Sequence, residues 1–447
     1  MPFLPMTESN REEMLKAIGV SDFEELIACI PEEVRLKRDL DLPEPLSEFE
    51  VSKHLQSLAS RNEHAGEFAC FLGGGAYDHF IPAAVGHLTS RSEFYTAYTP
   101  YQPEVAQGNL QAIYEYQTMI CNLTGMDAAN ASMYDGASAL AESALLIQGQ
   151  TRRETVLISR SVHPYYRQVA DTYCNRAGID LVELPTQNGM TDLSALKEKC
   201  NDTTAGLLMQ SPNFFGLLEP VDEMVETVHT TGGLVSVSAD PISLGILKPP
   251  GESGADVVTG EGQVLGLPLN FGGPYLGIFA VKQPLIRRMP GRLVGVTQDL
   301  DGKRGYVLTL QTREQHIRRE KATSSICTNQ QLCALSATIY MALMGKQGLP
   351  RVAELSLQKA HYLADELEKL SGVELLFKNS FFKEFAVRLP VPAKKVITKM
   401  RSEKIFAGID LSRFDYDLPN SLLVAVTEKR TREEMDRYVS VLRNMLS

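Results

Sequence analysis

The sequence predicts an α/β protein with a mainly parallel sheet, a helical amino-terminal arm and a smaller carboxy-terminal α/β domain. Three observations support this class. Between about residues 91 and 330, short β-rich runs alternate with helical stretches. The runs are almost continuously apolar, as strands are when helices cover both faces of a parallel sheet. The 447 residues also exceed what one ordinary core accommodates, which favours several domains.

The arm, expected over residues 1–62, reads as a series of short helices. Ser21 precedes Glu24 by three residues and Ser47 precedes Glu50 by three, which is the capping-box spacing at a helix start. Short helices are marginally stable by themselves. We therefore expect the arm to bury its apolar faces against the main body or against a partner.

The large domain is expected over residues 63–330. In parallel sheets, ligands bind beyond the carboxyl ends of the strands, so functional residues are expected there. Helical spacing marks Tyr165–Ala177 and Val221–Thr230. The predicted strands are Thr155–Ser159, Ile179–Leu184, Ala205–Gln210, Leu234–Ser238 and Leu276–Val281.

The small domain is expected over residues 331–447. A long helix through Leu335–Met344 leads to a second at Pro350–Leu370, where proline suits the first helical turn. A closing helix begins at Thr431. The predicted strands are Val373–Phe377, Phe385–Leu389 and Leu422–Val426.

Composition excludes several classes of protein. A net charge of −11 disfavours nonspecific binding to nucleic acid, which requires Lys and Arg against the phosphates. No stretch reaches the roughly 20 apolar residues that span a bilayer, and the first residues do not resemble a signal peptide. The seven cysteines are odd in number, widely spaced and without a C-x-x-C pair, which argues against disulfides and zinc. A cytoplasmic protein without a metal is expected.

Small residues open the helix predicted after residue 132. Ser132, Gly136 and Ser138 leave backbone N–H groups free at the helix start, where a phosphate can bind. The alternative is an ordinary helix start in which Asp135 or Ser138 is the cap.

Two polar residues follow predicted strands. His163 comes after Thr155–Ser159 and either lies flat against a cofactor ring or is simply hydrogen-bonded in place. Asp240 comes after Leu234–Ser238 and either pairs with a protonated pyridine nitrogen or turns the chain. Phosphate loop, histidine and aspartate stand in the order found in aminotransferase-like pyridoxal enzymes.

The lysine of such an enzyme is missing. Pyridoxal phosphate enzymes bind their cofactor covalently through a lysine amine, and by the same resemblance the lysine would lie within 254–266. That stretch contains no lysine. Lys248 comes too early, in a Pro/Gly turn, and Lys282 ends a strand.

Two further segments are unusual. A turn-rich loop carries three closely spaced tyrosines, which are either packed surface or part of a site: Tyr95, Tyr98 and Tyr101. The run 313–327 is basic in an acidic protein and has the default interpretation of a solvated helix face. Because it ends in Thr323 and Ser324, it could instead offer hydroxyls to a phosphate.

Four segments resemble the glycine cleavage system P-protein family, glycine dehydrogenase (decarboxylating), and the likeness covers essentially the whole chain: Phe71–Asp78, Tyr98–Glu104, Pro290–Gly295 and Gln311–Gln330. The resemblance implies a fold-type I pyridoxal phosphate-dependent transferase, aminotransferase-like in fold. In many bacteria this enzyme is split into two homologous subunits. The chain resembles subunit 1, the amino-terminal-half subunit, whereas the Schiff-base lysine belongs to subunit 2.

The resemblance also implies an activity and a site. Glycine is decarboxylated with pyridoxal phosphate held covalently by the partner subunit, and the aminomethyl group passes to the lipoyl group of the H-protein. The expected assembly is a heterotetramer with two copies of each subunit. Thr323 and Ser324 would contact the partner's cofactor, and Tyr95, Tyr98 and Tyr101 would line the approach of glycine and the lipoyl group. The remaining residues would form a vestigial pocket: Ser132, Gly136, Ser138, His163 and Asp240.

Two other readings stay open. The chain could be an independent pyridoxal-dependent decarboxylase or lyase that uses an unrecognised lysine. It could also be a non-catalytic scaffold that stabilises the partner without touching its site.

Overall fold

The computed structural model describes residues 6–446 except 323, 327 and 328, and the chain divides into two compact units at residues 63 and 64. The first unit is the arm, with helices α1 (Glu8–Ile18), α2 (Phe23–Leu26) and α3 (Glu48–Ala59). None of its described residues is buried, so the helices of the arm build no core by themselves.

One of the two predicted capping boxes is confirmed. At the start of α3 the Ser47 hydroxyl accepts from the backbone of Glu50, whose carboxylate accepts from the backbone of Ser47. The other prediction is wrong, because Asp22 and not Ser21 caps α2. The Asp22 carboxylate reaches the first-turn N–H groups one residue further along, and Asp is as good a cap as Ser.

A seven-stranded sheet organises the second unit, and its strand order is β2-β10-β9-β8-β7-β3-β4. The strands from β9 to β4 are parallel, while β10 runs antiparallel to both of its neighbours. The predicted mainly parallel α/β class is therefore confirmed. The strands are β2 (Ala128–Ala129), β3 (Thr155–Ser159), β4 (Asp180–Leu184), β7 (Thr204–Gln210), β8 (Leu234–Ser238), β9 (Val257–Glu261) and β10 (Gly277–Val281).

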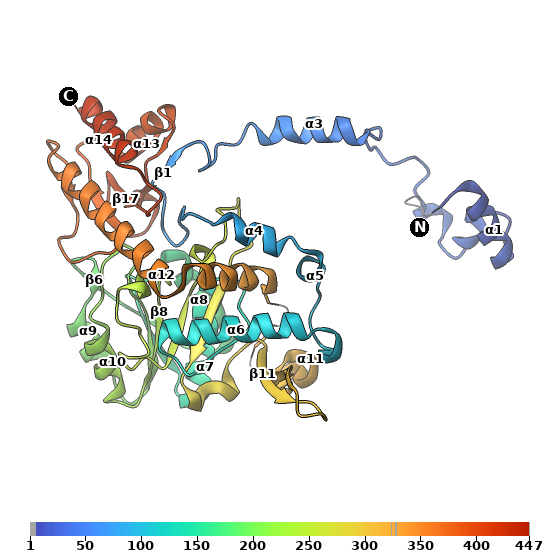
Figure 1. Ribbon diagram of the computed structural model, residues 1–447, viewed down its shortest axis with the longest axis horizontal. Coiled ribbons are helices and arrows are strands. Elements are labelled where there is room, and N and C mark those ends of the chain that lie inside the picture. Colours follow the sequence, from blue (N-terminus) through green and yellow to red (C-terminus); the bar gives the residue numbers. More distant parts are fainter. Residues whose placement is uncertain (1–5, 323, 327–328, 447) are drawn as a thin grey trace. The chain divides into compact units, whose positions relative to one another are not determined.

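Helices cover both faces of this sheet (Figure 1). Leu157 of β3 packs in one core with the helices α6, α10 and α12, whereas Val156 and Ile158 pack in another with α7 and α8. This alternation follows from the two-residue period of a strand. The helices are α6 (Gln107–Thr124), α7 (Gly136–Thr151), α8 (Pro164–Ala177), α9 (Leu193–Lys199), α10 (Val221–His229) and α12 (Gln331–Glu368). None of the helices in the described part of the chain is long and apolar enough to cross a membrane.

Smaller elements lie at the periphery of the sheet. The hairpin β11 (Leu293–Gln298) and β12 (Arg304–Thr309) packs against α6. The tyrosine loop begins in a short helix, α5 (Ser92–Tyr95). The others are β1 (Ala69–Cys70), α4 (Ala83–Thr89), β5 (Thr186–Gln187), β6 (Met190–Thr191), α11 (Gln315–Arg318) and β15 (Ile405–Phe406).

The carboxy-terminal segment has a sheet and a core of its own, and we call it the small lobe. Helix α12 enters it across a kink at Gly345, whose φ is 58°, and Pro350 follows in the first turns after the kink (Figure 1). The sheet order is β13-β14-β17-β16. Its elements are β13 (Glu374–Leu375), β14 (Glu384–Arg388), α13 (Ala393–Ser402), β16 (Ile409–Asp410), β17 (Ser421–Ala425) and α14 (Arg432–Leu446).

Candidate functional site

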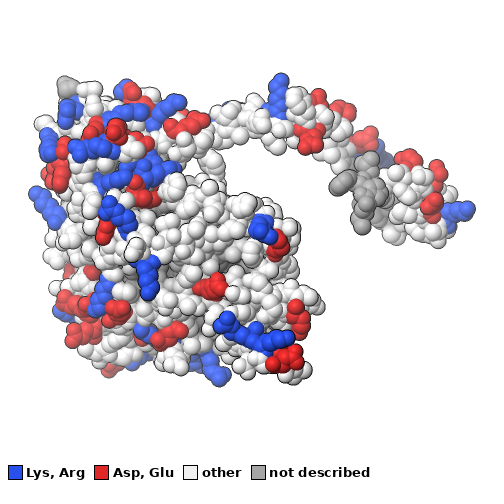
Figure 2. All heavy atoms as spheres, viewed as in Figure 1, with Lys and Arg blue, Asp and Glu red and all other residues white. Residues whose placement is uncertain are grey.

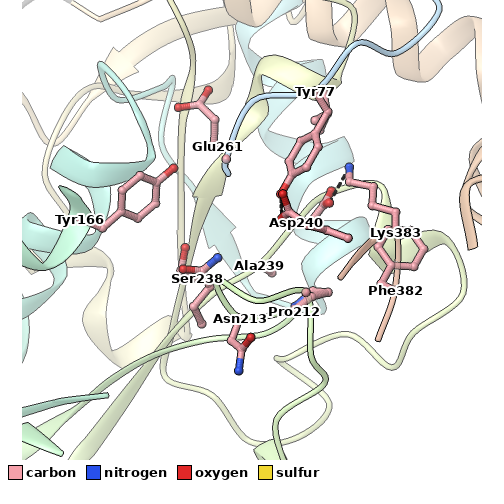
Figure 3. Close-up of a pocket in the computed structure, with 15 residues that line it drawn as sticks. Tyr77, Tyr166, Pro212, Asn213, Ser238, Ala239, Asp240, Glu261, Phe382 and Lys383 are labelled. Carbon is pink, nitrogen blue, oxygen red and sulfur yellow. Dashed lines mark hydrogen bonds and ion pairs between the residues drawn. The ribbon is translucent and has the colours of Figure 1, made fainter. Parts of the chain in front are cut away.

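A small polar cavity lies where the carboxyl ends of three parallel strands meet the small lobe (Figure 3). We call it the central pocket. Gln210, Ser238 and Glu261 are the last residues of β7, β8 and β9, and Asp240 follows β8 by two residues. The small lobe contributes Lys383 and Glu384 from the start of β14. Strand ends of this kind are where ligands bind in parallel sheets, but this cavity measures only about 40 Å³.

The Asp240 carboxylate forms an ion pair with Lys383. The ammonium of Lys383 lies 2.6 Å from the Asp240 carboxylate, and the lysine side chain is only 2% exposed (Figure 3). The same ammonium lies 3.8 Å from the ring centroid of Tyr77, close enough for a cation–π contact. A buried charge is tolerated when it is paired and hydrogen-bonded, and Lys383 satisfies both conditions.

Lys383 also begins a buried series of hydrogen-bonded side chains. Lys383 Nζ donates to Nε2 of His79 at 2.9 Å, and Nδ1 of His79 lies 2.6 Å from the carboxylate of Glu428. Burial lowers the pKa of His79, so the imidazole is neutral and donates its Nδ1 proton to Glu428. Burial would raise the pKa of Glu428, but this hydrogen bond and the backbone N–H of Phe80 lower it to about 2.

A second carboxyl closes the start of α7. One oxygen of Glu261 accepts from the backbone N–H of Gly136 at 2.9 Å, and the other accepts from Leu276 and Gln263 at 2.9 and 3.0 Å. The Asp135 side chain accepts from Ser138 N at 2.7 Å. Burial raises the pKa of Glu261 to about 8. The helix start that could hold a phosphate thus has its N–H groups bound to carboxyl groups of the chain itself.

The side chain of Tyr166 takes up further space beside this helix. A Cβ at Gly136 would lie 2.5 Å from the Tyr166 hydroxyl oxygen, so the tyrosine packs directly on the helix start and only glycine fits there. The groups that a pyridine ring and its phosphate would need, the Asp240 carboxylate and the N–H of Gly136, are bound by Lys383 and Glu261. The residues of the central pocket therefore do not fit pyridoxal phosphate.

The five residues expected in a vestigial pocket are only partly brought together. Asp240 lines the central pocket, and Gly136 borders it through Glu261. Ser138 instead takes part in the cap at the start of α7. Ser132 lies elsewhere, where its hydroxyl accepts from Asn329 and Gln330, which follow the basic run.

His163 has a structural environment. Its Nε2 lies 2.8 Å from the Gly74 carbonyl, and its ring stacks on Tyr166 with centroids 4.9 Å apart. Burial lowers its pKa to about 4, so the ring is neutral at physiological pH. The sequence alternative in which His163 is simply hydrogen-bonded in place matches these contacts.

The tyrosine loop and the basic run meet around one buried arginine, and we call this cluster the loop junction. The Arg292 guanidinium donates to the Tyr101 hydroxyl at 2.9 Å and to the Asn329 side-chain oxygen at 3.3 Å. Its side chain is 3% exposed, and Glu314 lies 3.9 Å away as its counter-ion. Arg292 thus connects the hairpin with the tyrosine loop, with Glu314 at the start of the basic run and with Asn329 just after that run.

The residues around the loop junction differ in exposure. Tyr95 and Tyr98 are 65% and 79% exposed and Tyr101 is 43% exposed, so much of their ring surface is free to meet a ligand or another chain. Figure 2 shows charged residues on this side of the second unit near α5 and near α11, with uncharged surface between them. Thr323 lies outside the described residues. The Ser324 hydroxyl donates to buried Glu142 of α7 at 2.9 Å.

Two residues of the central pocket were missed at the sequence level. Lys383 lies 143 positions from Asp240, and only its place between Phe382 and the predicted strand Phe385–Leu389 hinted that it is buried. Glu261 stands in a Gly-Glu-Gly sequence that reads as a turn rather than as the end of a strand.

Stability is expected to fall as the pH rises from 6.5 to 8.5. Burial raises the pKa of Glu261 to about 8 and those of Glu142 and Glu384 to about 7. These groups keep a proton in the folded state that the unfolded chain has lost, so their stabilising contribution is complete below about pH 4.5 and disappears through pH 7–8. His163 and His79, with lowered pKa values, act in the opposite direction only below about pH 6.5. Calorimetric Tm values across this range measure the effect.

A substitution isolates one of these carboxyls. Glu142→Gln keeps the shape and removes the titration, so its Tm should fall less with rising pH than that of the wild type. Glu198→Gln, at an exposed position on α9, is the matched control and should follow the wild type. Parallel curves for wild type and Glu142→Gln would contradict the expectation.

The class of protein follows from three features: the strand order of the sheet, the Asp240 carboxylate after β8 and the start of α7 beside it. They define the fold of a fold-type I pyridoxal phosphate enzyme. In this chain the pocket of that fold is closed by side chains. The model of the glycine cleavage system P-protein family matches residues 1–442, and the chain belongs to that family. The resemblance inferred from the motifs is thereby confirmed.

Relatives of this family match the chain along its whole length. Probable glycine dehydrogenase (decarboxylating) subunit 1 of Chloroherpeton thalassium is 55% identical and covers 100% of both chains. The protein of the same name from Carboxydothermus hydrogenoformans is 56% identical, with 99% of each chain covered.

Solved structures agree. A crystal structure of glycine decarboxylase (P-protein) of the glycine cleavage system, in inhibitor-bound form, superimposes with a TM-score of 0.93 at 44% identity and covers 100% of both chains. A Lactobacillus brevis glutamate decarboxylase shares the fold alone, with a TM-score of 0.70 at 13% identity over 92% of this chain and 95% of that one.

Proposed function

We propose that this chain is the half of a two-subunit glycine-decarboxylating enzyme that does not hold the cofactor. The partner subunit carries pyridoxal phosphate on its lysine, and the two chains form a heterotetramer with two copies of each. The enzyme releases CO₂ from glycine and transfers the aminomethyl group to the lipoyl group of the H-protein. Pyridoxal phosphate supplies the electron sink for this decarboxylation. This chain supplies side chains at the subunit interface.

The placement of the lysines supports a borrowed amine. Lys248 forms an ion pair with Asp222 at 2.9 Å on the surface, and Lys282 donates to the carbonyl of Gly125. Neither lines the central pocket. In the pocket itself, Lys383 and Glu261 already bind the groups that would anchor a cofactor.

The loop junction is the observation that carries the proposal. Tyr101 and Asn329 come from segments about two hundred residues apart, yet Arg292 holds both. A positioned set of side chains reaches a neighbouring site with little further ordering, which is how distant residues contribute to catalysis. We assign Tyr95, Tyr98 and Tyr101 to the approach of glycine and the lipoyl group, and Thr323 and Ser324 to the phosphate of the partner's cofactor.

One observation favours an independent enzyme as the second candidate. Lys383 lines the central pocket and carries an amine. However, that ammonium is paired with Asp240, the carboxylate that would have to face the pyridine nitrogen. The Lys383 ammonium cannot stay paired with Asp240 and at the same time form an imine with the cofactor aldehyde.

If the chain were only a scaffold for the partner, the loop junction and its exposed tyrosines would have no role in the reaction.

Removing the hydroxyl groups of Thr323 and Ser324 tests the proposed contact with the phosphate. In the complex, Thr323→Ala together with Ser324→Ala should weaken retention of pyridoxal phosphate roughly tenfold or more, because hydrogen bonds to a charged group are lost. Cofactor absorbance after dialysis measures this, and size-exclusion chromatography shows that assembly is intact. Ser325→Ala is the matched control. Unchanged retention in an intact complex would remove this loop from the site.

A further inference from the structure

The central pocket still has the two anchoring points of a cofactor site, and both are occupied by the chain's own side chains. One anchor is the carboxylate after β8, Asp240, which in this class of fold pairs with a cationic ring nitrogen. The other is the start of α7, where backbone N–H groups bind a phosphate. The inference below concerns only this pocket and does not depend on the reaction proposed above.

Lys383 stands at the first anchor. Its ammonium is a cation 2.6 Å from the Asp240 carboxylate, and it lies over the Tyr77 ring (Figure 3). His79 accepts a second hydrogen bond at 2.9 Å. A protonated ring nitrogen would present a cation to the same aspartate, so the lysine satisfies the same electrostatic requirement.

Glu261 stands at the second anchor. Its two oxygens accept three backbone N–H bonds, from Gly136, Gln263 and Leu276. Oxygen acceptors on a helix start are what a phosphate group would provide. The carboxyl comes from the last residue of β9, so it is fixed by the sheet and reaches the helix without a loop.

The small lobe is fastened at the same place. Glu384, next to Lys383, accepts from Gly74 N at 2.7 Å and from the Tyr77 hydroxyl at 2.8 Å. Lys383 forms an ion pair with Asp240, which follows β8 of the seven-stranded sheet. The neighbouring Asp78 forms ion pairs with Lys429 and Arg430 beyond β17. Adjacent residues of the small lobe thus close the pocket and join the two sheets.

We propose that the central pocket is permanently closed by side chains that replace a cofactor: the Lys383 ammonium takes the place of the ring cation and the Glu261 carboxyl takes the place of the phosphate. The pocket binds no pyridoxal phosphate in the native chain. Lys383, with Glu384 beside it, also holds the small lobe against the central sheet. Shortening Lys383 converts the pocket into a binding site for a primary alkylammonium ion.

Chemical rescue tests the first replacement in the full-length chain. Lys383→Ala leaves the Asp240 side chain, which is 12% exposed, without its cation, and a Tm lower by about 4–6 °C is expected for a unit of this size. The atoms removed correspond to n-propylammonium, so this ion should raise the Tm of Lys383→Ala in a saturable manner. Uncharged 1-propanol should not do so. Leu422→Ala, a cavity variant in buried β17, is the matched control and should not respond to the ion.

A double substitution keeps the test decisive if Lys383→Ala does not fold. Asp240→Asn combined with Lys383→Met removes both charges and should be more stable than Lys383→Met alone, because no unpaired carboxylate remains. A double variant no more stable than Lys383→Met, or a folded Lys383→Ala that ignores n-propylammonium, would overturn the proposal. Uptake of pyridoxal phosphate by the wild-type central pocket, seen as cofactor absorbance retained on the chain alone, would overturn it as well.

Discussion

The chain alone is expected to release no CO₂ from glycine, even at saturating pyridoxal phosphate. Adding the second P-protein subunit and lipoylated H-protein should raise glycine–CO₂ exchange by roughly 10⁴-fold or more over free cofactor. The physical reason is the closed central pocket, in which Asp240 and the start of α7 are already bound by Lys383 and Glu261. Exchange of labelled CO₂ into glycine measures the rate.

The second subunit assayed alone is the control that separates the two contributions. If this chain completes the site, the partner by itself should also be nearly inactive, although it holds the cofactor. Exchange by the isolated chain at a rate near that of the complex would contradict the account. Full activity of the partner alone would make this chain a scaffold.

Arg292→Lys is expected to lower glycine–CO₂ exchange in the complex by roughly 10- to 100-fold. A lysine keeps the charge opposite Glu314 but has no planar fork, so it cannot hold Tyr101 and Asn329 together. A displacement of about 1 Å in a positioned side chain can cost about a factor of 100 in rate. Arg292 is therefore assigned as a positioning residue that acts through the tyrosine loop.

Kinetic constants separate positioning from a general loss of structure. A displaced tyrosine loop should change KM for glycine or for H-protein by a different factor than kcat, whereas partial unfolding should lower only the active fraction. Arg351→Lys, at an exposed arginine of α12 that pairs with Glu354, is the matched control and should behave like the wild type. An Arg292→Lys complex with normal constants would remove the junction from the mechanism.

Much of the fold follows from the alternation of apolar runs with helical stretches. The bounds of β3 and β8 coincide with the predicted strands, because charged residues flank β3 and turn residues lie before and after β8. β9 was not predicted, since its last residues Gly260 and Glu261 interrupt the apolar run. That strand is buried by its position in the sheet rather than by its own composition.

The site residues were predictable only where their position follows from the residues next to them in the sequence. Asp240 was identified because it follows a strand end, and its position at the central pocket agrees with that reasoning. Lys383 comes from the other lobe, and no spacing rule connects it with Asp240. Arg292 could not be identified either, because its position in the site depends on contacts with segments that are distant in the sequence.

Borohydride reduction of the complex with pyridoxal phosphate, followed by peptide mapping, tests most directly whether the amine comes from the partner. The account predicts reduced cofactor on a lysine of the second subunit alone. Lys248, Lys282 and Lys383 of this chain should remain unmodified. Reduced pyridoxyl phosphate on Lys383, or on any other lysine of this chain, would contradict it.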